Sequence, residues 1–164
     1  MSVIVRTARI EDLSALGQLA GALVRFHRAL NPARYMLVEG VEAGYARYFG
    51  SELTNPNAVI LAATDGARIV GYAYGRLEER DWNALLDRHA ALHDIFVEPD
   101  ARRGGVGRQL LAAMLRELEA RGAPRVLLHT AVENREAQAL FAAFGFRITM
   151  LEMTRENPNA PVDQ

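Results

Sequence analysis

The sequence predicts a mixed α/β layer fold, with an antiparallel first half and crossover helices in the second half. Three observations lead to this fold class. Apolar residues recur at helical spacing in four segments, and short apolar runs of strand length lie between them. The dipeptide Asp65-Gly66 separates two of these runs and is the strongest short hairpin signal in the chain. After residue 97, helices and strands alternate, which is typical of crossover connections.

The first half begins with a short strand at residues 3–6. Residues 11–27 predict an amphipathic helix, because their apolar side chains recur on one helical face. Asn31-Pro32 ends this helix, since the residue before a proline avoids the helical conformation. Residues 38–52 predict a second, weaker helix.

The strands on either side of the hairpin turn are predicted at residues 58–64 and 68–77. Both runs are apolar, and they are separated by residues that favour a tight turn. Residues 91–97 (ALHDIFV) form a further apolar strand. These three segments give the sheet its antiparallel part.

The second half repeats a helix and a strand. Residues 106–118 predict a helix, 125–130 a buried strand, and 134–144 a short helix. Gly145 ends that helix, because glycine readily takes the left-handed conformation that follows many helices. Residues 146–153 (FRITMLEM) are predicted to close the chain as a last strand.

Composition limits the function classes. With 50% hydrophobic and 24% charged residues, the chain has the composition of a globular protein. A formal net charge of -1 argues against nucleic acid or an anionic membrane as a partner. The chain has no cysteine, which excludes disulfides, thiolate catalysis and zinc–cysteine sites. All 19 basic residues are arginine, which excludes a catalytic lysine and a Walker-type phosphate loop.

The expected domain organisation is simple. A chain of 164 residues suits one domain, since domains usually have about 100–200 residues. We expect one domain at residues 1–156 and a frayed tail at 157–164. No apolar run approaches the roughly 20 residues of a membrane span, and the first residues do not resemble a signal peptide. A cytoplasmic location is therefore expected.

Residues 100–111 (DARRGGVGRQLL) place a glycine-rich turn between a strand and a helix. Such a turn directs several backbone N–H groups outwards at the helix N-terminus, where phosphate oxygens bind well. Glycines let a phosphate approach the backbone, and arginines can add charge-assisted hydrogen bonds. The alternative is a flexible turn with solvated arginines. The predicted anion site comprises Arg102, Arg103, Gly104, Gly105, Val106, Gly107 and Arg108.

At this point the chain resembles a known family. The pattern V-x-P-x-x-R-x-x-G-x-G is similar to the central motif of the GNAT superfamily of acyl-CoA-dependent N-acyltransferases. A second motif, an asparagine before a short helix that ends in Gly-Phe, follows at the family's spacing. The resemblance covers nearly the whole chain and is strongest over residues 92–147. The matching positions are Val97, Pro99, Arg102, Gly105 and Gly107, followed by Asn134, Ala137, Leu140, Phe141, Gly145 and Phe146.

The resemblance implies a GNAT fold, in which a mixed central sheet has helices on both faces and splays between its fourth and fifth strands. It implies acetyl-CoA as cosubstrate and no metal. The glycine-loop amides would hold the pyrophosphate, and the backbone of Ile95, Phe96 and Val97 would bond the pantetheine amides. The family usually has a β-bulge in this strand, and its position is not evident from the sequence. The other implied cofactor contacts are Asn134, Ala137, Leu140 and Phe141.

Two residues are candidates for the general base that takes a proton from the amine. His93 and Asp94 precede the implied pantetheine-binding stretch, where related enzymes often carry an acidic residue. Successive strand residues face opposite sides, so at most one of the two is expected to line a given cleft. We favour Asp94, because a carboxylate within an apolar strand needs a functional or hydrogen-bonding reason.

The general acid is the weakest match, because Phe141 stands where many family members have a tyrosine that protonates the leaving thiolate. Three explanations stay open. The thiolate leaves unassisted or through water, another hydroxyl such as that of Tyr72 or Tyr74 serves, or catalysis is impaired.

The predicted function is an N-acetyltransferase that acts on a primary amine of a small molecule or peptide. One alternative is a GNAT-fold module that binds acyl-CoA with little or no turnover. The other is a phosphate- or nucleotide-binding regulatory protein that uses only the loop.

The acceptor amine is expected to contact residues 25–52 and the loop 78–91, and neither has a motif that identifies it. The segment 80–92, which contains Trp82, predicts either a short helix over the acceptor side or a packed surface loop. Dimers are frequent in the family, so the resemblance also allows a homodimer.

Overall fold

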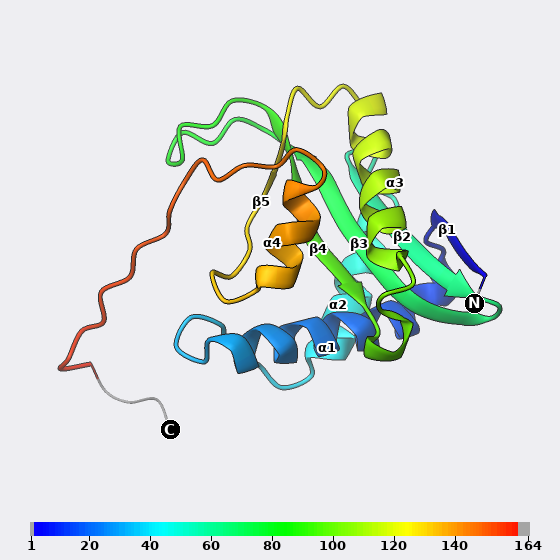
Figure 1. The fold of residues 1–164 in the computed structure, drawn as a ribbon, viewed down its shortest axis with the longest axis horizontal. Helices are drawn as coiled ribbons and strands as arrows, with labels where there is room; N and C mark the ends of the chain where they lie inside the picture. The colour runs from blue at the N-terminus through cyan, green and yellow to red at the C-terminus, as the bar shows by residue number, and fades with distance from the viewer. Residues whose placement is uncertain (1, 161–164) are drawn as a thin grey trace.

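The structure, a computed structural model, describes residues 2–160 (Figure 1). Its strands are β1 (Val3–Thr7), β2 (Ala58–Asp65), β3 (Arg68–Glu78), β4 (His89–Val97) and β5 (Val126–Leu128). Its helices are α1 (Leu13–Leu30), α2 (Val41–Glu52), α3 (Val106–Ala120) and α4 (Arg135–Ala142). Short 3₁₀ turns, Ile10–Asp12 and Pro99–Ala101, precede α1 and the glycine loop.

The strands form one mixed sheet in the order β1-β2-β3-β4-β5. The first four strands pair antiparallel, whereas β5 runs parallel to β4 after the crossover through α3. The predicted hairpin is confirmed: β2 and β3 pair on either side of a turn in which Gly66 has a φ of 60°. The predicted mixed α/β class is therefore confirmed.

The sheet splays between β4 and β5. The two strands pair only where Ala90 and Leu92 lie opposite Val126 and Leu128. Beyond Leu92, β4 continues to Val97 without β5 beside it. This separation confirms the splay that the family resemblance implies.

A β-bulge lies in β4 at His93. Asp94 pairs with Tyr74, and Leu92 pairs with Gly75. Tyr74 and Gly75 are consecutive in β3, whereas their partners on β4 are separated by one extra residue, His93. A bulge of this kind bends its strand and increases the local twist. The bulge directly follows Leu92, the last residue of β4 that pairs with β5, so it lies where the two strands separate.

Helices cover both faces of the sheet (Figure 1). On one face α3 packs across the strands, and the buried core there includes Leu110, Leu111 and Met114. On the other face α1 and α2 cover a second core around Leu16, Phe49 and Tyr72. The two cores hold the three central strands β2, β3 and β4, whereas β1 and β5 form the edges of the sheet and β5 has only three residues.

The prediction of a strand at residues 146–153 is wrong. The chain leaves α4 and runs away from the sheet without regular structure (Figure 1). Within the described residues no strand pairs with it, and its apolar side chains Ile148, Met150 and Met153 are exposed. Alternating polarity marks a segment that suits a strand, and the outer edge of β5 is available, but the segment runs instead towards Arg34, whose guanidinium bonds Glu152.

A short helix was one of the two structures predicted for residues 80–92, and it does not form. Its tip is a turn closed by a bridge between Asp81 and Leu86, and Trp82 is 74% exposed. Of the predicted tail at residues 157–164, positions 161–164 lie outside the described residues, and the domain limits remain a prediction. Between residues 2 and 160, no helix is long and apolar enough to cross a membrane.

Candidate active site

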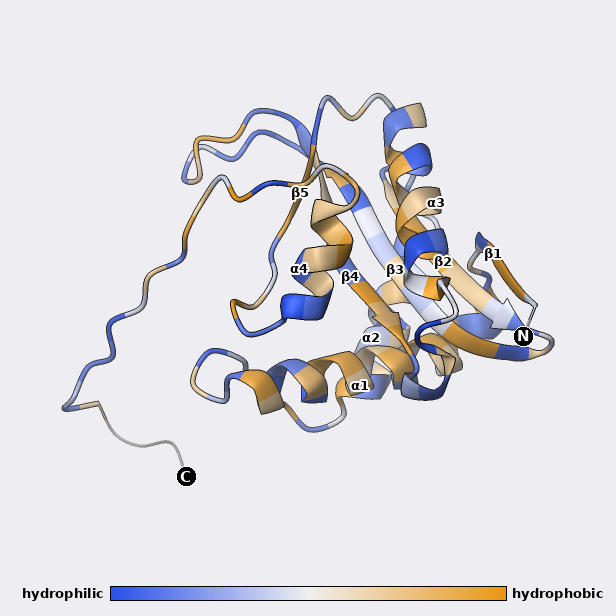
Figure 2. Ribbon diagram, viewed as in Figure 1, coloured by the Kyte–Doolittle hydropathy of each residue, from blue (hydrophilic) through white to orange (hydrophobic). Residues whose placement is uncertain are grey.

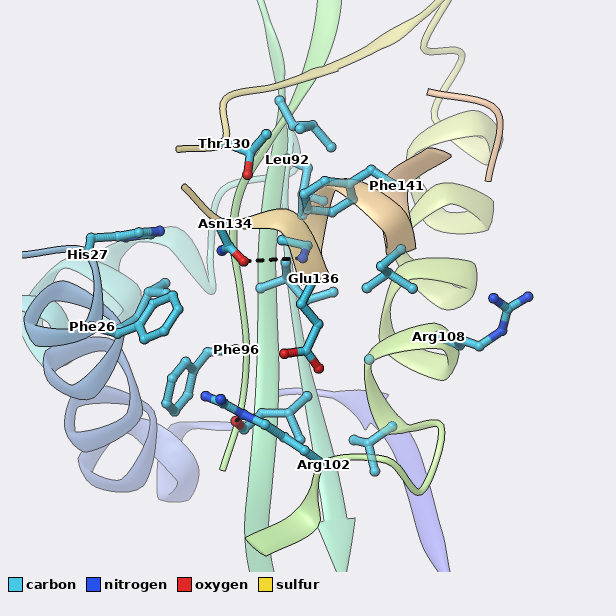
Figure 3. A pocket seen from close by; sticks show the side chains of 18 of the residues that line it. Phe26, His27, Leu92, Phe96, Arg102, Arg108, Thr130, Asn134, Glu136 and Phe141 are labelled. Carbon is cyan, nitrogen blue, oxygen red and sulfur yellow. Dashed lines mark hydrogen bonds between the residues drawn. The ribbon is translucent and has the colours of Figure 1, made fainter. Parts of the chain in front are cut away.

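A cavity of about 370 Å³ lies where β4 and β5 separate (Figure 3). The end of β4, the glycine loop, the segment after β5, and α4 form its walls, and α1 closes one side. The predicted cofactor residues that line it are Ile95, Phe96, Val97, Arg102, Arg103, Gly105, Val106, Gly107, Arg108, Asn134, Ala137, Leu140 and Phe141. Gly104 belongs to the same loop but lies outside this lining in the described structure.

The glycine loop leaves backbone donors free at the start of α3. Gly105 and Arg103 take the left-handed conformation, with φ values of 77° and 66°. The first intrahelical hydrogen bond runs from the Gln109 amide to the Gly105 carbonyl, at 3.0 Å. In the described part of the chain, the amides of Gly107 and Arg108 therefore have no acceptor. Free amides at a helix N-terminus are suited to bind an anion.

Arg102 is the arginine that the structure fixes at the cavity. Its Nε donates a hydrogen bond to the Val97 carbonyl at 2.9 Å, and its guanidinium lies 5.5 Å from the Phe96 ring centroid. By contrast, Arg108 is directed away from the other labelled side chains (Figure 3). Its guanidinium lies over the Phe144 ring, 5.1 Å from the centroid.

The α4 wall is mostly apolar. The Asn134 side chain accepts a hydrogen bond from the Ala137 amide at 3.2 Å, so its observed role is to cap the start of α4. Phe141 is 6% exposed, and its ring contacts that of Phe146 with centroids 5.9 Å apart. A ring packed in this way gives the cavity a smooth wall without a proton donor.

His93 lines the cavity, and its ring is held on two sides. It stacks on Tyr74, with ring centroids 5.3 Å apart, and its Nε2 lies 2.8 Å from a Glu78 carboxylate oxygen. A carboxylate partner fixes both the orientation and the tautomer of an imidazole. His93 therefore has the surroundings of an oriented base, with 42% of its side chain accessible.

Asp94 points to the same side of the sheet as His93. The expectation that they face opposite sides is wrong, because the bulge adds one residue between the paired positions. Asp94 accepts a hydrogen bond from the Tyr72 hydroxyl at 3.0 Å, and burial raises the pKa of its carboxyl group. In the described structure it does not line the cavity. Its observed role is to accept the hydrogen bond from Tyr72, on the face of the sheet that α1 and α2 cover.

The tyrosine hydroxyls considered as acids are engaged elsewhere. Tyr74 donates to Glu52 at 2.5 Å and also lies 2.8 Å from the Tyr48 hydroxyl, while Tyr72 donates to Asp94. Burial raises the pKa of both Tyr72 and Tyr74. Neither is among the side chains that line the cavity in the described structure.

Some cavity residues have no sequence signal. Thr130 follows β5, and Phe26 and His27 come from the end of α1 (Figure 3). His27 also lines a second cavity, of about 810 Å³, which lies along α1 and α2. Its ring stacks on Tyr35 at 4.9 Å, and burial lowers its pKa. Helical periodicity indicated only that this helix packs on a core, so it could not single out the last turn.

The sequence of this chain is similar to known proteins. The model of the Acetyltransferase (GNAT) family matches residues 23–146. The uncharacterized N-acetyltransferase YhfO of Bacillus subtilis (strain 168) is 28% identical over 142 residues, which cover 87% of this chain and 88% of YhfO. No group of three or more His, Cys, Asp or Glu residues placed to hold a metal ion occurs within residues 2–160.

Two solved structures have the same fold. A tetramutant of the BH1408 protein from Bacillus halodurans superposes with a TM-score of 0.80 at 18% identity, covering 94% of this chain and 99% of that one. The aminoglycoside N-acetyltransferase AAC(6')-Iy in complex with CoA has a TM-score of 0.71 at 21% identity, covering 96% and 95%. The splayed sheet and glycine loop, together with these matches, lead to one conclusion: the chain belongs to the GNAT acetyltransferase family and is an acyltransferase.

Proposed function

We propose that this protein transfers the acetyl group of acetyl-CoA to a primary amine of a small molecule or peptide, by direct attack of the amine on the thioester. One observation carries the proposal: the cavity combines free helix-terminal amides, an exposed β4 backbone and an oriented histidine. A solved relative in fold was obtained in complex with CoA, which supports the same ligand here.

In this proposal, different walls of the cavity bind different parts of the cofactor. The amides of Gly107 and Arg108 would bind the pyrophosphate, and Arg102, which lines the same cavity, would add positive charge to it. Beyond Leu92, β5 does not pair with β4, and this edge of β4 would bond the pantetheine amides as an added strand would, next to the Val97 carbonyl that already accepts a hydrogen bond from Arg102. Acetyl-CoA itself supplies the activated acyl group.

His93 is the base in this proposal. An ammonium has no lone pair, so the amine must lose a proton before its nitrogen attacks the thioester carbon. The imidazole accepts that proton, and Glu78 stabilises the imidazolium across their 2.8 Å contact. The C–S bond then breaks, the nitrogen loses its second proton to water, and the thiolate leaves beside Phe141 and takes a proton from water. Asp94 does not contact the substrate in this proposal, and its part is limited to the hydrogen bond from Tyr72.

The acceptor amine enters from the α1–α2 side. The second cavity lies along these helices, and His27 borders both cavities. This position agrees with the expectation that residues 25–52 contact the acceptor. The carboxylates of Glu52 and Glu78 lie on this side of the sheet. Both contact the guanidinium of Arg76, at 3.4 and 3.3 Å, so only part of their charge is left to attract a cationic amine.

The test measures thiol release from acetyl-CoA on a panel of polyamines, aminoglycosides, amino acids and peptides with free N-termini. The chain contains no lysine, so acetylation of its own side-chain amines gives no background. We expect His93→Gln to lower kcat by about 10²–10⁴-fold, the usual contribution of general base catalysis. Asp94→Asn keeps an acceptor for Tyr72 and is expected to cost far less. A His93→Gln enzyme with unchanged kcat would exclude His93 as the base.

A further inference from the structure

The second cavity, of about 810 Å³, has the volume of a small-molecule site. The end of α1, the loop after it and one face of α2 form its walls. Residues of α2 at helical spacing make up that face: Val41, Gly44, Tyr45 and Tyr48. His27 borders both cavities, so a molecule in the second cavity can reach the first beside this residue.

Most side chains around the second cavity are apolar or aromatic. The loop after α1 contributes Tyr35, Met36 and Val38, and hydrophobic residues recur along α1 beside it (Figure 2). The Tyr35 ring stacks on the His27 ring, with centroids 4.9 Å apart. Gly44 adds room, because a Cβ built on it has no atom within 4 Å. Walls of this kind bind the apolar body of a ligand by removing its surface from water.

The charges around the second cavity balance. The charged side chains that line it are Arg34, Glu39 and Arg47. Arg34 is bonded to the Glu152 carboxylate, and its guanidinium lies 5.2 Å from the Tyr35 ring centroid. Glu39 and Arg47 are both exposed and carry opposite charges. Among the described residues, the cavity therefore favours neither a second ammonium group nor a carboxylate on the ligand.

His27 lies where a ligand would pass from one cavity to the other. Burial lowers the pKa of its imidazole, which favours the neutral form with a free lone pair. The histidine rings that form hydrogen bonds in the described structure are those of His89 and His93, so the nitrogens of His27 are left for a ligand. Figure 3 shows its ring extending from the end of α1 toward Asn134.

We propose that the acceptor is a primary monoamine with an apolar body, which lies in the second cavity while His27 accepts a hydrogen bond from the amine nitrogen. This inference rests on the proposed function, because it names the acceptor of the same acetyl transfer. The amine then reaches His93 and the thioester through the junction of the two cavities. A second charged group on the body would have to leave water for walls that are mostly apolar, which is costly.

The first test compares three amines with the same carbon chain: hexylamine, 1,6-diaminohexane and 6-aminohexanoate. We expect kcat/KM for hexylamine to exceed that for each of the others by about tenfold or more, because hexylamine alone brings no second charge. A preference for the diamine would assign the selectivity to carboxylates such as Glu39, and a preference for 6-aminohexanoate would assign it to Arg47. Either preference, or equal values for the three amines, would overturn the proposal.

The second test places the body of the amine by calorimetry on the complex with CoA, which has no acetyl group to transfer. In Gly44→Leu the new side chain fills the cavity, and we expect the Kd of hexylamine to rise about tenfold with CoA affinity unchanged. Ala43→Leu is the matched control, since Ala43 is an exposed neighbour in α2 outside the lining. Unchanged hexylamine binding in Gly44→Leu, or an equal loss in both variants, would overturn the proposal.

The third test concerns the hydrogen bond to the amine. His27→Phe keeps a ring against Tyr35 and removes the nitrogens, so we expect KM for hexylamine to rise about fivefold or more while kcat changes less. An unchanged KM would exclude His27 as the amine's partner.

These measurements separate the failure of this inference from that of the proposed function. Acetyl transfer to other amines, with no binding of hexylamine to the CoA complex, would overturn this inference alone. Hexylamine binding that depends on Gly44, with no thiol release from acetyl-CoA on any amine, would support the ligand class of the cavity and overturn the proposed function.

Discussion

Phe141 is the residue at which this chain departs from its family's usual pattern. Its ring is buried and packed on Phe146, so the cavity wall there is closed and apolar. The two tyrosine hydroxyls that could replace the missing donor are bonded to Glu52 and Asp94. Release of the thiolate without a protein acid fits this arrangement.

We therefore predict that Phe141→Tyr changes kcat by much less than the 10²–10⁴-fold that is typical of general acid catalysis. The added hydroxyl also enters a packed wall, which costs stability through overpacking. Thiol release and the thermal midpoint measured on the same preparations check both parts. A gain in kcat of a hundredfold or more, within that typical range, would mean that the wild type lacks an acid that its reaction needs.

Asp12 is a buried carboxylate with an evident structural role. It accepts two hydrogen bonds from Arg6, at 2.7 and 2.9 Å, and a third from the Arg9 amide. The hydrogen bonds from Arg6 lower the pKa of Asp12 most strongly, while burial opposes them. Because the folded-state pKa lies below the unfolded one, this stabilisation is complete above the unfolded pKa and is lost as pH falls through the folded value.

We predict that Asp12→Asn lowers the free energy of unfolding by about 1–3 kcal/mol at neutral pH, since charged hydrogen bonds are replaced by weaker ones. The variant should also lose part of the decline in stability that the wild type shows below about pH 4. Urea unfolding across this range measures both effects. Glu11→Gln, at an exposed neighbouring site, is the control. Equal acid sensitivity in the wild type and Asp12→Asn would rule out this carboxylate as a source of it.

At the scale of elements, α1 and α2 approach each other closely because α1 carries glycines at the contact. A Cβ built on Gly17 would lie 2.5 Å from the Glu42 carbonyl oxygen, which belongs to the backbone of α2. The helices would have to separate to admit a methyl group. Gly44, in the middle of α2, has nothing within 4 Å of such a Cβ.

These two glycines give a matched pair of predictions. Gly17→Ala should lower the free energy of unfolding by about 1–3 kcal/mol through overpacking. Gly44→Ala should raise it by about 0.5–1 kcal/mol, because alanine is the better helix former and has space. Chemical denaturation of both variants tests the pair. Similar changes in both would mean that the helix contact is more yielding than the packing indicates.

Elements with strong local patterns were predictable from sequence. The hairpin at Gly66 and the helix after the glycine loop depend on turn chemistry and periodicity, which the sequence contains. The bulge at His93 depends on how β4 pairs with β3, and no property of His93 alone indicates it. Residues 146–153 have a strand-like pattern, but the sequence does not show that Glu152 bonds Arg34 and that the segment leaves the open edge of β5 unpaired.

At the scale of the whole molecule, the walls of the cavity come from segments that are far apart in the sequence. Motif spacing located the loop and α4, because the family resemblance covers both. It could not locate His27 or Thr130, since their place in the cavity follows from how α1 and β5 dock on the sheet. Cavity residues outside the two motifs were found only in three dimensions.

Ligand binding should stabilise the whole molecule. A ligand that binds only the folded state raises the free energy of unfolding by about 2.7 kcal/mol at a concentration of 100 Kd. We predict that acetyl-CoA raises Tm and that Gly107→Val removes this rise, because the added side chain occupies the anion site. The variant should fold, since a Cβ at Gly107 meets Leu140 at an ordinary 3.5 Å. An equal rise in Tm for both proteins would place the ligand elsewhere.

The bulge has a consequence for how β4 tolerates changes in length. Removing any residue from a regular strand turns all later side chains to the opposite face. His93 is the exception, because Leu92 and Asp94 already pair with consecutive residues of β3. A chain lacking His93 should therefore keep both cores and fold, with a straighter β4 that closes on β5. Thermal unfolding and acetyl-CoA binding would separate the two effects: the fold survives the deletion, and the opening that receives the cofactor does not.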